Sequence, residues 1–150
     1  MKRSVIVILS VFLAVSAHAQ TAVLFAVAIT GTPQDVQAAI NNGADVNAYS
    51  SAFMTPLITA ASFNDDPEVI TTLLKAGADL EAVDRSPYGM TALIAAASLN
   101  RNPEVIKTLL KAGANGRAKD KTGKTALDYA RRNYSLEGTD ALKQLEEASR

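Results

Sequence analysis

Residues 91–98 read TALIAAAS, and residues 102–115 read NPEVIKTLLKAGAN. Nearly the same strings stand earlier in the chain, TPLITAAS at 55–62 and DPEVITTLLKAGAD at 66–79. Recurrence at a spacing of roughly 20–50 residues is typical of repeat proteins, in which each unit buries its apolar face by stacking on a neighbour. The sequence therefore predicts a solenoid of stacked units.

Each unit has the pattern of two helices joined by a turn. Thr55 and Pro56 supply a cap and a first helical residue, and Asp66 and Pro67 do the same for a second helix. The second helix carries an apolar stripe at helical spacing, and Gly77 follows it as a residue that adopts the left-handed conformation ending many helices. We expect these residues to have packing roles.

The motifs Thr-Pro-Leu-x-x-Ala-Ala, Glu-Val-Ile-x-x-Leu-Leu and Ala-Gly-Ala-Asp resemble the ankyrin repeat. The resemblance covers about residues 22–148, and residues 55–127 carry its specific part. It implies an all-α solenoid of about four helix-turn-helix repeats joined by β-turn fingers. We expect an N-terminal capping repeat at 22–49, central repeats at 50–85 and 86–119, and a C-terminal capping repeat at 120–148.

The first 19 residues differ in character from the rest of the chain. Two basic residues precede an apolar run from Val5 to Val15, and Ala17-His18-Ala19 forms a small-x-small cleavage motif. This pattern (residues 1–19) is typical of a secretory signal peptide cleaved before Gln20, leaving a mature domain at 20–150. A membrane anchor is the alternative, but an anchor needs about 20 apolar residues. Because polar residues interrupt the run, we expect no stable membrane anchor.

Cysteine is absent from the chain, which excludes disulfides and lipoprotein attachment. An exported repeat protein without disulfides fits a bacterial periplasm, and secretion is the alternative. The mature length suits one compact domain, which we expect to be monomeric when free.

Charge is spread unevenly along the chain. Residues 20–84 hold eight acidic side chains and one basic side chain, whereas residues 85–132 hold ten basic and three acidic ones. The solenoid should therefore be acidic at its N-terminal end and basic toward its C-terminal end. The two signs balance over the whole chain, and nothing in the pattern indicates a nucleic-acid partner.

Few residues in the chain are suited to catalysis. The single histidine, His18, lies in the predicted signal peptide, so the mature chain has neither imidazole nor thiol for a catalytic pair or an ordinary zinc site. Asp65 and Asp66 form the one carboxylate pair that suggests metal binding or acid–base chemistry, but Asp66 is already explained as a helix cap. We expect no cofactor, no metal and no enzymatic activity; an enzyme of unrecognised type is the alternative.

The resemblance implies that protein partners bind the concave face, which the inner helices and the fingers form. The variable contact positions of the family fall on Ser62, Phe63, Ser98 and Leu99. The fingers add six candidate contact residues: Tyr49, Phe53, Met54, Arg85, Tyr88 and Met90. As the alternative, these are ordinary exposed side chains, and Phe53 folds back to cover the core.

The fingers depart from the family pattern in two places. Phe53 stands where the turn glycine is expected and Ser50 where an aspartate is, and a bulky residue disfavours a positive φ, so we predict an irregular first turn. The second finger is two residues longer, and Pro87-Tyr88-Gly89 predicts a protruding tip. The family tends to carry a histidine that ties neighbouring units, at the positions held here by Ile58, Ile94 and Asp128. How the turns of adjacent units are joined therefore stays open.

Together these observations predict a non-catalytic protein-binding module exported to the periplasm. We expect its partner to be a periplasmic or envelope protein. Inhibition or protection of a cell-envelope enzyme is the sharper hypothesis, and a structural or assembly subunit of a periplasmic complex is the alternative.

Overall fold

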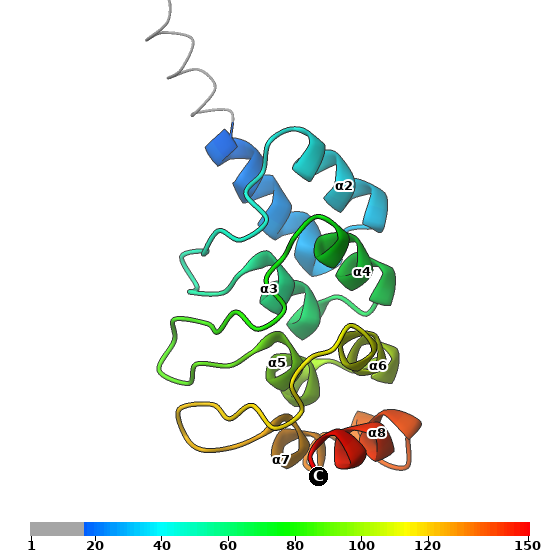
Figure 1. Cartoon of the computed structure of the whole chain (residues 1–150). Coiled ribbons are helices and arrows are strands. Elements are labelled where there is room, and N and C mark those ends of the chain that lie inside the picture. The colour runs from blue at the N-terminus through cyan, green and yellow to red at the C-terminus, as the bar shows by residue number, and fades with distance from the viewer. Residues whose placement is uncertain (1–16) are drawn as a thin grey trace, which may run out of the picture.

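A computed structural model of the chain describes residues 17–150. Its helices form a stack, and the connectors between successive pairs project to one side, the left in Figure 1. Residues 17–30 are helical and precede α2. The elements after them are α2 (Pro33–Asn41), α3 (Pro56–Phe63), α4 (Pro67–Lys75), α5 (Ala92–Leu99), α6 (Pro103–Lys111), α7 (Ala126–Ala130), the 3₁₀ turn η1 (Tyr134–Leu136) and α8 (Asp140–Ala148).

The stack has two layers of helices. In the inner layer α3 packs on α5 and α5 on α7, and in the outer layer α2 packs on α4, α4 on α6 and α6 on α8. In α5 all residues from Ala92 to Ala97 are buried, whereas α6 buries only Val105, Ile106 and Leu109 along one face. The alanines of α5 are small, so neighbouring inner helices approach closely, while the outer helices expose a polar face. The predicted all-α solenoid of helix pairs is confirmed.

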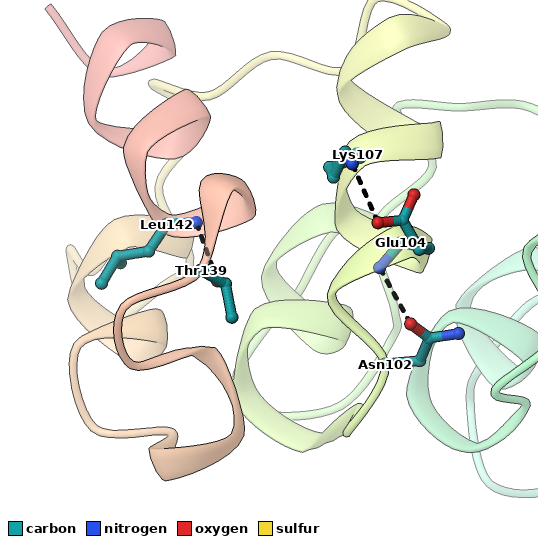
Figure 2. A network of polar contacts seen from close by, with 5 residues as sticks. All are labelled: Asn102, Glu104, Lys107, Thr139 and Leu142. Atoms are coloured by element: carbon teal, nitrogen blue, oxygen red, sulfur yellow. Dashed lines mark hydrogen bonds and ion pairs between the residues drawn. The ribbon is translucent and has the colours of Figure 1, made fainter.

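The helices begin at the capping residues that the sequence indicates. Thr55 Oγ1 accepts a hydrogen bond from the backbone N–H of Ile58 at 3.3 Å, and a proline follows the cap. Figure 2 shows the start of α6, where Asn102 Oδ1 accepts from the backbone N–H of Glu104 at 3.0 Å. The Glu104 carboxylate also lies 2.8 Å from Lys107 Nζ. Each cap satisfies a backbone donor that the first helical turn leaves free.

The outer helices end at glycines with a positive φ. Gly43, Gly77 and Gly113 have φ values of 95°, 93° and 97°. After α4, the N–H of Gly77 donates to the Leu74 carbonyl, and similar bonds follow α2 and α6. Only glycine adopts this conformation without a steric penalty from a Cβ atom, so the predicted helix ends are confirmed.

Buried asparagines tie successive helix pairs together. Asn100, at the end of α5, is 1% exposed, and its Nδ2 donates to the carbonyls of Ala61 and Asn64, both at 3.0 Å. Its Oδ1 accepts from the N–H of Asn102 at 2.8 Å. One pair before, Asn64 Nδ2 donates to the Gly31 carbonyl; one pair after, Asn133 Nδ2 donates to the carbonyls of Ala97 and Asn100. The Oδ1 atom of each also accepts a backbone N–H two residues on. This row, the asparagine ladder (Asn64, Asn100 and Asn133), joins the turns of adjacent units.

The last inner helix, α7, is short. It ends at Ala130, and Arg131 and Arg132 form a turn. This turn brings Asn133 to the position from which it donates to the Asn100 carbonyl at 2.9 Å. The final helix, α8, begins at Asp140, directly after its N-cap residue Thr139.

The start of the chain packs as an inner helix. Leu24 and Ala28 have no exposed surface and belong to the apolar core. The predicted signal peptide lies outside the described residues except for positions 17–19, which belong to the same helix. Among residues 17–150, no helix is long and apolar enough to cross a membrane.

Candidate functional site

Three connectors project from the stack, and we call them the fingers: residues 47–54, 83–90 and 119–124 (Figure 1). Each finger is closed by a backbone hydrogen bond of 2.9 Å near its base. The bonded N–H and carbonyl pairs are Ser50 with Met54, Asp84 with Met90, and Asp120 with Lys124. Because each finger leads directly into the capped start of an inner helix, its position follows from that helix.

The acidic side chains of the second and third fingers point into their own turns. Asp84 is buried and accepts from the N–H groups of Ser86 and Gly89. Asp120 is buried as well, and its Oδ1 accepts from the backbone N–H groups of Thr122 and Lys124 at 2.8 and 3.0 Å. Both carboxylates are therefore buried and hydrogen-bonded within their own turns, so they do not face a partner.

The surroundings of Asp120 stabilise its ionised form. Burial alone would raise the pKa of this carboxyl, but hydrogen bonds from the Tyr129 and Thr122 hydroxyls and from two backbone N–H groups outweigh burial. Together they lower the pKa of Asp120 to about 2. The hydrogen bond between Tyr129 and Asp120 also raises the pKa of Tyr129, because the Tyr129 hydroxyl donates to Asp120 Oδ2 at 2.6 Å.

The prediction of an irregular first turn is wrong. Phe53 has a φ of 66°, and its N–H donates to the Ser50 carbonyl at 2.9 Å. In the third finger Gly123 has a φ of 84° and makes the same bond to Asp120 at 3.0 Å. The first finger thus keeps the regular turn, because its backbone bonds hold Phe53 in a conformation that a residue with a Cβ atom disfavours.

Neighbouring fingers are fastened to one another by their backbones. The N–H of Arg85 donates to the Phe53 carbonyl at 2.9 Å, and the N–H of Lys121 donates to the Tyr88 carbonyl at 2.8 Å. The Arg85 guanidinium also lies 3.7 Å from the centre of the Tyr49 ring. The fingers therefore form one connected surface, which we call the finger face.

The six predicted finger residues divide into two groups. Phe53, Tyr88 and Arg85 are exposed on the finger face, and Tyr49 is half-buried beneath Arg85. Phe53 is 54% exposed, so the alternative in which it folds back over the core is wrong. Met54 and Met90 are corrected to a packing role, because both are partly buried against the apolar core at the base of their fingers.

The four contact residues predicted at the ends of the inner helices also fall into two groups, two exposed and two buried or half-buried. Phe63 and Leu99 are exposed at the ends of α3 and α5, where they line a hollow of about 360 Å³ together with Asp65 and Arg101. Ser62, however, is buried, and its hydroxyl donates to the Ile58 carbonyl at 2.8 Å. Ser62 is therefore corrected from a contact residue to a helix-packing residue. The remaining position, Ser98, is half-buried.

The comparison with protein families explains this arrangement. Residues 60–148 match the family model described as ankyrin repeats in three copies. The chain belongs to the ankyrin-repeat family. No curated protein matches it. Ankyrin repeats typically bind proteins and typically lack catalytic activity, which makes the exposed finger and helix-end residues the candidate contact surface.

Tyr134, an exposed aromatic residue of this ankyrin stack, was not predicted as a contact. Tyr134 is 91% exposed in η1 and lines a hollow of about 230 Å³ that Arg131 and Glu137 also border. The available signal was an aromatic residue among polar ones just after the last inner helix. It was missed because the segment was interpreted only as part of the C-terminal capping repeat at 120–148.

The carboxylate pair offers no catalytic arrangement. Asp66 Oδ1 accepts from the backbone N–H of Glu68 at 2.9 Å, so it acts as the predicted helix cap, and Asp65 is exposed beside the hollow. Within residues 17–150, no three His, Cys, Asp or Glu side chains lie together in a manner that could hold a metal ion. The exposed side chains of the finger face and the helix ends include aromatic rings, aliphatic groups and cations.

Proposed function

We propose that this ankyrin-repeat chain is a non-catalytic protein-binding module that works in the periplasm, where it inhibits or protects a cell-envelope enzyme. One observation carries the binding proposal: exposed aromatic and aliphatic side chains stand on a connected frame of fingers and inner helices. Phe53, Tyr88, Phe63 and Leu99 are each about half exposed. Large exposed apolar groups on a rigid frame are typical of protein interaction sites.

The export proposal is supported by the sequence of the leader. A basic start, an apolar run and the motif Ala17-His18-Ala19 precede Gln20. Cleavage there would leave the buried Leu24 and Ala28 in place, so the first inner helix would keep its core contacts. Thr21, whose Oγ1 accepts from the N–H of Asp45 at 3.0 Å, would also remain. The mature chain would thus keep its N-terminal helix against the rest of the stack.

The test is capture of periplasmic proteins on the mature chain, followed by affinity measurements with Phe63→Ala, Leu99→Ala and Tyr88→Ala. Each side chain is exposed, so truncation should change the free energy of unfolding by no more than about 0.5 kcal/mol. Loss of an interface anchor should weaken binding by about 2 kcal/mol, which corresponds to a roughly 30-fold increase in Kd.

Two results would contradict the proposal. If the three variants melt like the parent and bind the captured protein equally well, the concave face is not the contact surface. If the periplasmic fraction lacks a chain that begins at Gln20, the export proposal is wrong while protein binding is unaffected.

A further inference from the structure

Phe53 combines exposure with an unfavourable backbone conformation. Among the described residues it is the one non-glycine residue with a positive φ, whereas the equivalent positions of the other fingers hold Gly89 and Gly123. The ring is 54% exposed, so burial of the side chain does not offset the unfavourable backbone. Strained residues that do not serve the fold are concentrated at functional sites. Glycine would suit the turn better, so the observation points to a role for the ring itself.

The exposed charge on the finger face is basic. The first finger carries no charged residue, and the acids of the other two, Asp84 and Asp120, are buried within their turns. Arg85, Lys119 and Lys121 remain exposed. A surface of this kind attracts negatively charged groups and repels positively charged ones.

The cations of this face are held in place rather than free in solvent. Arg85 stacks on Tyr49, and Lys121 Nζ donates to the Ser86 carbonyl at 2.9 Å. Each of these groups has further N–H donors that can bind a carboxylate. Arg85 thus lies against the first finger and Lys121 against the second, so two carboxylates of one acidic segment would each meet one cation, while Phe53 at the first finger offers an apolar contact.

We propose that the finger face binds an acidic segment of a partner protein, with Phe53 as the apolar anchor and Arg85 and Lys121 as the carboxylate-binding groups. This inference rests on the proposed function and adds the chemistry of the partner. A protein fits better than a nucleic acid, because the whole chain has a formal net charge of zero and nucleic-acid binders are typically basic.

The length of such a segment follows from helix packing. Packed helices lie about 8–10 Å apart, so the three fingers, each attached to one inner helix, span about 20 Å. An extended chain advances about 3.3 Å per residue, so about six residues cover the finger face. A random peptide of about twelve residues is therefore a sufficient probe.

The experiment selects peptides of that length from a phage-displayed random library on the purified chain. We expect the enriched peptides to have a net negative charge beside an aromatic or aliphatic residue. They should bind Phe53→Gly at least about tenfold more weakly, and their affinity for the parent should fall severalfold as salt rises from about 50 to about 300 mM. Tyr134→Gly, which removes an exposed aromatic ring outside the fingers, is the matched control and should bind as the parent does.

Thermal melting distinguishes an anchor from a structural residue. Phe53→Gly should melt at or above the temperature of the parent, because glycine accepts the positive φ. A clear decrease in its Tm would show that the ring stabilises the fold and would overturn the inference.

The binding results overturn it in three further cases. These are enrichment of neutral or basic peptides, equal binding of the peptides to Phe53→Gly and the parent, and absence of any enrichment. Equal competition by a single-stranded oligonucleotide would also overturn it, in favour of nucleic-acid binding. None of these outcomes affects the capture of a periplasmic partner, on which the proposed function depends.

Discussion

Asn100→Ala tests whether the asparagine ladder holds the stack together. The substitution removes two hydrogen bonds to carbonyls of the preceding turn, those of Ala61 and Asn64, each 3.0 Å long. It also removes the acceptor for the N–H of Asn102, 2.8 Å away. The side chain bridges two helix pairs, so its loss affects the interface between units rather than either unit alone.

The magnitude follows from burial. Asn100 is 1% exposed, and leaving one buried polar group without a partner costs about 1–3 kcal/mol. Asn102 is only half-buried, so water can replace its bond, and the two carbonyls account for most of the loss. We therefore expect Asn100→Ala to lower the free energy of unfolding by about 2–4 kcal/mol. Asn133→Ala, at a half-buried position in the same ladder, should cost about 1–2 kcal/mol.

Urea unfolding followed by far-ultraviolet circular dichroism measures both values. Asn42→Ala is the control, because this asparagine is exposed at the end of α2 and should change stability by no more than about 0.5 kcal/mol. A change of that small size in Asn100→Ala would refute the reasoning, since it would mean that the ladder does not stabilise the stack.

Two further predictions concern the core and the third finger. Leu73→Ala and Leu109→Ala each remove a fully buried side chain and should lower the free energy of unfolding by about 2–5 kcal/mol; denaturation midpoints near that of the parent would show that the core is misplaced. The folded pKa of Asp120, about 2, lies below the unfolded value near 3.9, so its ionised form stabilises the fold above about pH 4. That contribution, about 1–2 kcal/mol, should be lost as the pH falls from about 4 to about 2. Tyr129→Phe removes one bond to the carboxylate and should move the loss to higher pH, as measured by NMR titration of the Asp120 carboxyl; an ordinary pKa in the parent would contradict this.

The features that the sequence predicted correctly are local ones. Thr55 caps the helix that follows it, and Gly77 ends the helix before it, because cap and turn geometry depend on a few neighbouring residues. The apolar stripe of the outer helices also follows from helical periodicity alone. Two copies of each signal in register made the stacked arrangement predictable.

The features that were missed depend on contacts between units. The turn at Phe53 has a positive φ, and the N–H of Arg85, from the next finger, bonds to the Phe53 carbonyl. Ser62 is the exception: it was expected to face a partner but is buried, and its hydroxyl donates to the Ile58 carbonyl of its own helix. Asparagine directly after two successive inner helices, at Asn64 and Asn100, was the available signal for the ladder. The Nδ2 groups of these asparagines donate to carbonyls of the preceding unit, so the sequence of one unit alone does not reveal the bonds.

The distance between the exposed finger residues and the exposed helix-end residues Phe63 and Leu99 constrains the shape of the partner. The fingers enter the inner helices at their N-terminal ends, while Phe63 and Leu99 lie at the C-terminal ends of α3 and α5. An eight-residue helix is about 12 Å long, so an extended segment lying across the fingers contacts Phe53 without reaching Phe63. Substitutions more than about 10 Å apart usually act independently. A folded partner that covers both groups should therefore lose affinity additively in Phe53→Gly and Phe63→Ala, whereas an isolated acidic segment should respond to Phe53→Gly alone.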